Sequence, residues 1–438
     1  MSSRLLLAPL LLLSLAVPAS AAAEAYVPGE VLVRYEEGTS AAAADGVERL
    51  TGTETEATLS GGTERVAIED GGSVRGTIAE LRRDPAVAYA VPNWRARAAA
   101  FIPNDPRRRL QWNFFGKFGI NMPDAWELAA FRGAPGGRGA VVAVLDSGVA
   151  YERFGPFRRA PDLRASTFVR GYDYIDADGH PNDEHGHGTH VAGTIAQATN
   201  NRLGTTGIAY GAKIMPLRVL DSQGLGDSFA IARAIRYAAR RGADVINLSL
   251  DFLPRVQAPQ IPDVLSAIRY ARRRGVVLTA AAGNAYGQPV AYPARAPGVM
   301  AVGATTRSGC EADYSSAGVD LDIVAPGGGK DAANTFSRWD RNRCNPGSTP
   351  KPIFQQTFFK PGLVNRFELR GPKFEGTSMA SGHVAAVAAL VIAAGRVGRD
   401  PPPDLVEQHL EATARDAGPR GFDRFYGNGL VDAAAALR

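Results

Sequence analysis

Four polar residues in four separate segments carry side chains suited to acid–base, nucleophilic or oxyanion chemistry. Asp146 follows the apolar run AVVAVL, and His187, Asn284 and Ser378 lie in HGTHVAG, AAGN and GTSMAS. Taken singly, each has a simpler explanation, because Ser and Asp often cap helices and Asn is common in turns. Taken together, they provide a nucleophile, a general base, a carboxylate that can orient the base and an amide that can donate to an oxyanion.

A cluster of histidines leaves two interpretations open. His185, His187 and His190 are three of the six histidines in the chain. With the neighbouring acidic residues they could ligate a metal ion, as in a metal-dependent hydrolase. Alternatively, one histidine is a general base and the others are structural. The HExxH pattern of metalloproteases is absent from the sequence, which favours the second interpretation.

The elements that must position these residues follow an α/β pattern from about residue 112 onward. Continuous apolar runs predict strands at 140–145, 213–219, 244–250, 276–281 and 299–304. Helical patterns cover 228–241, 264–274 and 379–395. Apolar strands that alternate with helices predict a mostly parallel sheet with helices on both faces. The carboxyl ends of such strands form the edge where sites assemble, and Asp146 and Asn284 follow two of these strands.

The N-terminal part of the chain has a different organisation. Residues 1–23 contain one arginine, an apolar run and small residues, and therefore predict a secretory signal peptide. Residues 24–94 predict a small α+β domain, with strands at 31–35, 65–69 and 86–93 and an amphipathic helix at 73–84. Residues 95–104 lose this periodicity and are expected to form a linker and processing region. Residues 105–438 form the remaining domain, in which the turn-rich stretch at about 328–372 predicts a surface insertion.

The net charge of +5 is unevenly distributed. Residues 24–94 contain 13 acidic and 6 basic residues, a net charge of −7, whereas residues 95–438 contain 31 acidic and 42 basic residues, a net charge of +11. The arginines are scattered without interleaved aromatic residues, so no nucleic-acid partner is expected. No stretch after the signal segment is long and apolar enough to cross a membrane. We therefore expect an exported protein, extracellular or periplasmic, with no membrane attachment after signal removal.

The two cysteines, Cys310 and Cys344, lie in contexts that do not suggest a nucleophile or a zinc site. In an oxidising compartment they are expected to form one disulfide.

The four motifs, in this order, resemble those of subtilisin-like serine proteases (subtilases, the peptidase S8 family). They are VLDSGV at 144–149, HGTHVAG at 187–193, AAGN at 281–284 and GTSMAS at 376–381. The order Asp, His, Ser is the subtilisin order of the triad. The similarity extends over about residues 105–438, and residues 26–94 resemble the inhibitory propeptide of the family.

This resemblance implies a role for each motif residue. Ser378 would attack the scissile carbonyl and form an acyl-enzyme, and His187 would accept and return the proton. Asp146 would orient His187, and Asn284 would bind the oxyanion together with the backbone N–H of Ser378. No cofactor is implied for catalysis. The alternative is a catalytically inactive protein that uses the same fold for binding.

The resemblance also implies a substrate cleft for an extended protein or peptide. One edge would be Gly224, Leu225 and Gly226, and the other Ser249, Leu250 and Asp251; Ala282 and Gly283 would line the S1 pocket. Subtilases usually have Gly at position 251 and Pro at position 382, where this chain has Asp251 and Gly382. We hypothesise that the carboxylate of Asp251 favours basic substrate side chains.

A structural calcium ion and an intramolecular inhibitor are further implications of the resemblance. The calcium ligands would be the side chains of Asp105, Asp162 and Asn201 and the carbonyls of Ala198, Leu203 and Thr205. The competing interpretation is that these are turn residues. The propeptide would inhibit the enzyme and be removed by self-cleavage within 95–104. The protein is expected to be a monomer.

Overall fold

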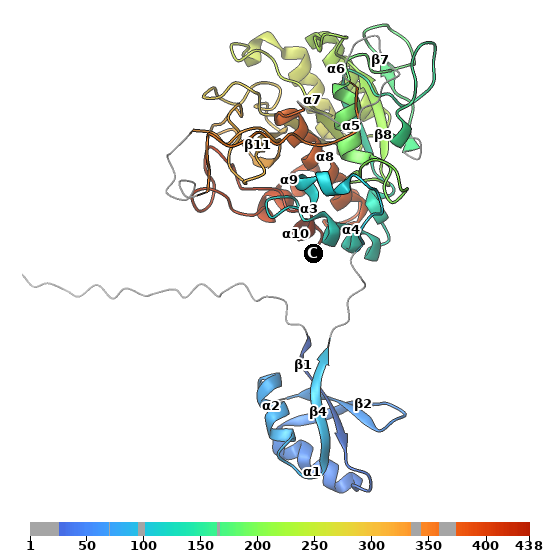
Figure 1. Cartoon of the computed structure of the whole chain (residues 1–438), viewed down its shortest axis with the longest axis vertical. Helices are drawn as coiled ribbons and strands as arrows, with labels where there is room; N and C mark the ends of the chain where they lie inside the picture. Colours follow the sequence, from blue (N-terminus) through green and yellow to red (C-terminus); the bar gives the residue numbers. More distant parts are fainter. Residues whose placement is uncertain (1–25, 70, 95–100, 164–166, 334–342, 359–373) are drawn as a thin grey trace, which may run out of the picture. The chain divides into compact units, whose positions relative to one another are not determined.

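The computed structural model describes residues 26–69, 71–94, 101–163, 167–333, 343–358 and 374–438 (Figure 1). The chain forms two compact units, which divide between residues 99 and 100. The expected signal peptide, residues 1–23, lies outside the described residues, as do residues 95–100 of the expected linker. No helix within the described residues is both long and apolar enough to span a membrane.

The N-terminal unit is a four-stranded antiparallel sheet with two helices, in the strand order β2-β3-β1-β4 (Figure 1). Its elements are β1 (Tyr26–Tyr35), α1 (Ala41–Thr51), β2 (Thr53–Thr58), β3 (Thr63–Ile68), α2 (Val74–Leu81) and β4 (Val87–Trp94). Its core includes Val31, Val33, Val66 and Leu81, all fully buried. The α+β prediction is confirmed.

Two elements of this unit, α1 and β2, were not expected from the sequence. Helix α1 buries only Val47 and depends on its N-cap, where the Ser40 side chain accepts a hydrogen bond from the Ala43 N–H. Strand β2 reads TETEAT and is an edge strand, so it has little apolar pattern to detect. Both elements lie at the margin of the core and are mostly exposed, so neither shows a clear apolar periodicity.

The larger unit contains a parallel sheet in the order β12-β11-β10-β9-β5-β8-β6, with β7 also paired to β8. The strands are β5 (Val141–Asp146), β6 (Thr167–Phe168), β7 (Tyr172–Asp173), β8 (Lys213–Arg218), β9 (Val245–Leu248), β10 (Val277–Ala281), β11 (Met300–Thr305) and β12 (Ile323–Pro326). The five strands and three helices expected here are present with ends shifted by no more than two residues. The short strands β6, β7 and β12 were not expected.

Helices cover both faces of this sheet, as predicted. Alternate residues of β5 show the division: Val142 and Val144 pack with α5 (His187–Ala196) and α8 (Thr377–Ala393), whereas Ala143 and Leu145 pack with α6 (Ser228–Arg240) and α7 (Pro262–Arg273). The first face is extended by α3 (Trp112–Phe115), α4 (Met122–Phe131), α9 (Pro403–Ala412) and α10 (Ala433–Leu437). Short 3-10 helices are η1 (Arg108–Leu110), η2 (Pro135–Gly137), η3 (Pro161–Leu163) and η4 (Ala258–Gln260).

The expectation of a surface insertion at 328–372 needs correction for part of that segment. Residues 334–342 and 359–373 lie outside the described residues, but Ile353, Thr357 and Phe358 are almost completely buried. The indole of Trp112 donates to the carbonyl of Pro352 at 3.1 Å, which ties the segment to α3. The segment before residue 353 is rich in turn-forming residues, and this composition led to the prediction of a surface insertion. The short run at 353–358 nevertheless packs into the core.

Cys310 and Cys344 form the expected disulfide, with their Cα atoms 5.8 Å apart. It connects the segment after β11 to the segment that leads into the buried stretch at 353–358.

Candidate active site

One open cleft of about 650 Å³ brings together His187, Asn284 and Ser378. Their positions follow from the ends of the elements around them. Helix α5 begins at His187, β10 ends three residues before Asn284, and α8 begins one residue before Ser378. Asp146 is the last residue of β5 and lies buried behind His187. The structure therefore assembles at one edge of the sheet the residues that the motifs single out.

The imidazole of His187 is oriented by a short hydrogen bond to a buried carboxylate. Its Nδ1 lies 2.7 Å from Oδ1 of Asp146, which also accepts from the backbone N–H of Ser147 at 2.7 Å. A carboxylate can only accept, so Nδ1 carries a proton and Nε2 is left as the base. Burial by itself would lower the pKa of His187, but the charge and hydrogen bond of Asp146, with a smaller effect of Asp183, raise it above its ordinary value.

Asp183 holds the start of α5 in place, a role that sequence reasoning missed. This fully buried carboxylate accepts from the hydroxyl of Ser147 at 2.9 Å, from the N–H of Gly186 at 2.9 Å and from the hydroxyl of Thr189 at 2.6 Å. Burial raises its pKa, which these hydrogen bonds counteract only in part. Position 188 must be glycine, because a Cβ atom there would lie 2.1 Å from the carbonyl oxygen of Gly148.

Ser378 lies inside the first turn of α8 and is not its cap. The N-cap is Gly376, with a φ of 155°, and no side chain caps the helix, so the simple explanation of Ser378 as a helix cap is wrong. The hydroxyl of Ser378 donates to the carbonyl of Ser249 at 3.2 Å, and the hydroxyl of Ser249 donates to the carbonyl of Ser378 at 2.7 Å. The nucleophile candidate is thus anchored beside β9, in the same cleft as His187, and rotation about its Cα–Cβ bond redirects its hydroxyl.

The amide of Asn284 is fixed by the residue before Ser378. Its Oδ1 accepts from the backbone N–H of Thr377 at 2.9 Å and from the Thr377 hydroxyl at 3.0 Å. With the oxygen occupied in this way, the NH₂ group is available as a donor in the cleft. An oriented donor beside a nucleophile is the arrangement that stabilises an oxyanion.

The three clustered histidines do not converge on a common point. His190 is fully buried, its Nε2 donates to the carbonyl of Ile353 at 3.0 Å, and its ring stacks on Phe374. Burial lowers the pKa of His190 to about 3, so the ring is neutral. His185 lines the cleft with His187, with ring centres 6.2 Å apart. Among the described residues no group of three or more His, Cys, Asp or Glu side chains could hold a metal ion, and the metal-hydrolase interpretation has no geometric support.

The cleft walls contain most of the expected substrate-binding residues. Those that line it are Gly224, Leu225, Gly226, Ser249, Leu250 and Asp251. Ala282 is buried behind the cleft, and the N–H of Gly283 donates to the Thr377 hydroxyl at 3.2 Å. Asp251 is the one carboxylate in the described lining; it is exposed to solvent, and partial desolvation by the surrounding cleft wall raises its pKa. Its Oδ2 lies 3.2 Å from the point where a Cβ of Gly283 would stand, so the acid adjoins the segment that carries Asn284.

The expected calcium ligands also come together, where Asp105 and Asp162 contact the loop that follows α5. Asp105 and Asp162 are fully buried, and Asn201 bridges them: its backbone N–H donates to Asp105 at 3.2 Å and its side-chain amide to Asp162 at 2.8 Å. Burial raises the pKa of Asp162 to about 6. The other expected ligands are the backbone carbonyls of Ala198, Leu203 and Thr205. None of them accepts a hydrogen bond from the described part of the chain. Such a set of oxygen atoms fits calcium.

Comparison with known proteins gives the family. A model of the subtilase family matches residues 137–429, and a model of the fervidolysin N-terminal prodomain matches residues 14–93. The chain belongs to the subtilase family.

Named relatives agree with this assignment. The chain is 34% identical to a thermophilic serine proteinase of Bacillus sp. (strain AK1), over 89% of this chain and 83% of the relative. It is 33% identical to thermitase of Thermoactinomyces vulgaris, over 77% of this chain and 100% of the relative. A solved structure of proteases from Pseudoalteromonas arctica matches with a TM-score of 0.60 and 32% identity, over 76% of this chain and 98% of that chain. The protein is a subtilisin-like serine endopeptidase with an N-terminal prodomain, and subtilases need no cofactor for catalysis.

Proposed function

We propose that the protein is a secreted endopeptidase that works through an Asp146–His187–Ser378 triad and is made as a self-processed zymogen. One observation carries the proposal: a buried carboxylate orients His187 through a 2.7 Å hydrogen bond, at a cleft that also contains Ser378 and Asn284. This constellation supports acyl transfer in the manner of a serine protease.

In the proposed reaction, the Ser378 hydroxyl turns from the carbonyl of Ser249 and attacks the scissile carbonyl. Nε2 of His187 accepts the hydroxyl proton and then gives it to the leaving amine, while Asp146 stabilises the imidazolium. The NH₂ of Asn284 and the N–H of Ser378 donate to the oxyanion. Water then attacks the acyl-enzyme. Nε2 of His187 accepts a proton from the water and gives it to the Ser378 oxygen, which leaves as the free hydroxyl.

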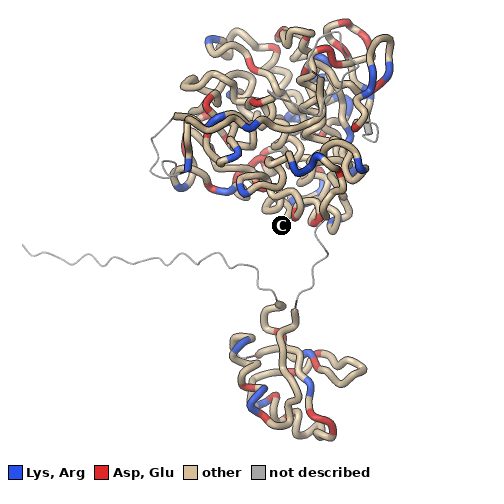
Figure 2. The backbone as a smooth tube through the Cα atoms, viewed as in Figure 1, with Lys and Arg blue, Asp and Glu red and all other residues tan. Residues whose placement is uncertain are grey.

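The N-terminal unit is proposed to act as the inhibitor of this cleft. Its net charge is −7 and that of residues 95–438 is +11. Figure 2 shows that acidic and basic residues are mixed along both units. The net charge of each unit therefore reflects a modest excess of one sign and not a continuous block of like charges. Opposite net charges favour association of the two units, and salt weakens such attraction. We propose signal removal after about residue 23 and self-cleavage within 95–104.

A fluorophosphonate probe tests the function directly, because it reacts with a serine only when that serine is activated. We expect covalent labelling of Ser378, found by peptide mass spectrometry, and no labelling of heat-denatured protein or of a Ser378→Ala variant. Ethylenediaminetetraacetate should leave the labelling of freshly treated enzyme intact. Peptide hydrolysis that is abolished by the chelator at once, and is insensitive to the probe, would contradict the proposal.

We propose that Asp105, Asp162 and Asn201 hold a structural calcium ion, since two buried carboxylates without a basic partner favour a cation. Chelation of calcium should lower Tm by roughly 5–10 °C, the shift expected when a ligand in large excess over its Kd is removed. Asp162→Asn should have a lower Tm that no longer responds to the chelator, measured by calorimetry. The exposed Asp320 provides a matched control, because Asp320→Asn should respond as the parent does. A parent Tm that the chelator leaves unchanged would exclude the site.

We propose that Asp251 gives the enzyme a preference for Arg or Lys at the residue that supplies the scissile carbonyl. The carboxylate adjoins Gly283 in the cleft, and no described basic side chain pairs with it. Asp251→Asn should lower kcat/KM for an Arg substrate by about 10–100-fold, since a charge-assisted hydrogen bond contributes about 1.5–3 kcal/mol. The kcat/KM of a matched Leu substrate should change little. Equal losses for both substrates, measured with fluorogenic peptides, would contradict this role.

A further inference from the structure

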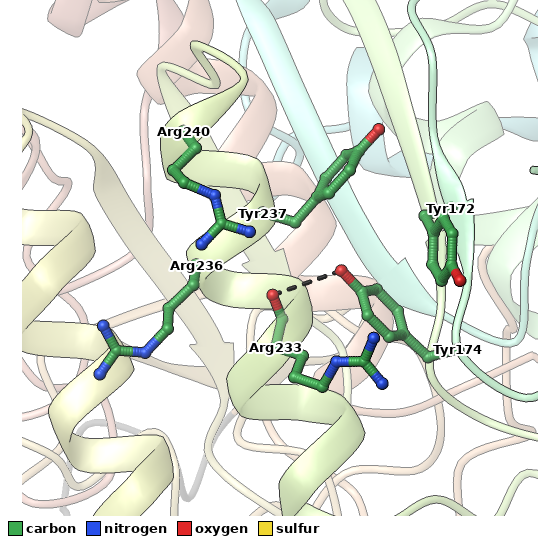
Figure 3. Close-up of a pocket in the computed structure, with 6 residues that line it drawn as sticks. All are labelled: Tyr172, Tyr174, Arg233, Arg236, Tyr237 and Arg240. Atoms are coloured by element: carbon green, nitrogen blue, oxygen red, sulfur yellow. Dashed lines mark hydrogen bonds between the residues drawn. The ribbon is translucent and has the colours of Figure 1, made fainter. Parts of the chain in front are cut away.

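A second pocket, of about 270 Å³, lies on the outer side of α6, away from the cleft (Figure 3). Its lining comes from two elements only: β7 and the residue that follows it provide Tyr172 and Tyr174, and α6 provides Arg233, Arg236, Tyr237 and Arg240. None of these residues lines the cleft that contains Ser378. The pocket therefore needs an explanation other than peptide hydrolysis.

The charge of this pocket is of one sign. Residues 228–241 contain four arginines and no Asp or Glu. Within the described part of the chain no carboxylate pairs with Arg233, Arg236 or Arg240, whereas the two arginines Arg218 and Arg272 each pair with at least two carboxylates. Like charges three or four residues apart destabilise a helix. Helix stability alone therefore does not account for the three guanidinium groups.

Aromatic rings hold two of these guanidinium groups in place. The guanidinium of Arg233 lies over the ring of Tyr174, 5.1 Å from its centre. That of Arg236 lies 5.1 Å from the ring centre of Tyr270 and donates to the Ser266 hydroxyl at 2.8 Å. A guanidinium stacked by its face keeps N–H donors along its edge for an oxyanion. The arginines are thus partly preorganised.

Two of the three tyrosine hydroxyls are already engaged. Tyr174 donates to the backbone carbonyl of Arg233 at 3.3 Å, the bond drawn in Figure 3, and Tyr237 donates to the carbonyl of Gly171 at 3.2 Å. The rings of Tyr172 and Tyr174 lie 4.8 Å apart, centre to centre. The pocket consequently offers guanidinium donors together with aromatic faces and no acidic group, which is a combination suited to an anion carried on a small molecule.

We propose that this pocket binds oxyanions of the phosphate and sulfate class, free or carried on a small cyclic molecule such as a sugar phosphate. The three arginines supply paired N–H donors and positive charge, and the tyrosine rings border the carrier. A single oxyanion cannot contact all three arginines, because Arg233 and Arg240 are separated by about 10 Å along the helix axis. Neighbouring guanidinium groups therefore share the binding of each oxyanion.

Binding can be measured by calorimetry on the full chain carrying Ser378→Ala, which prevents self-digestion. The probes are sodium sulfate and glucose 6-phosphate, each compared with sodium chloride at equal ionic strength. Both oxyanions should bind, and a variant with Arg233→Gln, Arg236→Gln and Arg240→Gln should bind them at least about tenfold more weakly. Its Tm in chloride should remain close to that of the parent, because relief of the repulsion between like charges on the helix offsets the lost stacking and the lost hydrogen bond to Ser266.

Two controls separate recognition of the oxyanion from general attraction. Arg307→Gln removes one exposed positive charge elsewhere and should leave the affinity unchanged. Glucose without phosphate should not bind. Equal affinity of the parent and the triple variant for sulfate, or binding of glucose as tight as that of glucose 6-phosphate, would overturn the proposal. Neither result would bear on the peptidase function, which is tested at Ser378.

Discussion

Replacement of Ser378 by alanine is expected to lower kcat for peptide hydrolysis by about 10⁶-fold, the loss known for the nucleophile of subtilisin. The variant keeps the cleft and the proposed oxyanion donor Asn284, but no hydroxyl remains to form the acyl-enzyme. The side chain is small and its hydroxyl makes one hydrogen bond, to the carbonyl of Ser249, so the fold should be retained. Rates with a fluorogenic peptide and Tm by calorimetry check the two expectations.

The same variant tests maturation. The parent protein should have an N-terminus within residues 95–104, whereas Ser378→Ala should keep the prodomain, as seen by intact mass and N-terminal sequencing. The double variant Ser378→Ala, His187→Ala should have nearly the same residual rate as Ser378→Ala alone. The effects of substituting residues that act as one unit are not additive. Two independent, multiplying losses would argue against a joint role for the two residues.

Replacement of Asp146 by asparagine is expected to lower kcat by about 10⁴-fold. The amide of Asn can donate to Nδ1 of His187, which would leave the proton on Nε2 and remove the base. The loss of charge also lowers the pKa of His187, because Asp146 is the main group that raises it against the effect of burial. A base acts when it is unprotonated, so the parent loses activity as the pH falls through this raised pKa.

The pH dependence of kcat/KM separates this role from a merely structural one. In the Asp146→Asn variant the residual activity should persist to lower pH than in the parent. An acid limb at the same pH in both proteins would contradict the assignment of His187 as the base. Asp178→Asn, at a partly exposed loop position outside the cleft lining, is a control that should leave both the rate and the pH profile unchanged.

Much of the fold was accessible from local sequence pattern. The central strands are apolar throughout because helices cover both faces of the sheet, and that continuous pattern can be read without knowing the partners. The polar edge strand β2, the Ala-rich helix α1 and the buried stretch at 353–358 were missed for a common reason. Helix α1 and strand β2 are mostly exposed and bury almost no side chains, whereas the stretch at 353–358 is buried by neighbours distant in sequence; in both cases the local composition does not reveal the element.

The sequence by itself determined the order of the four motifs and the chemistry available, because each motif lies at the end of an apolar strand or the start of a helix. Only the tertiary structure decided how the side chains meet. It showed that Asp183 holds the start of α5, that Ser249 anchors Ser378, and that arginines of α6 join tyrosines near β7 in one pocket. These contacts join residues 36 to 129 positions apart or lie between separate elements, so they arise from the packing of the folded chain and leave no local pattern to read.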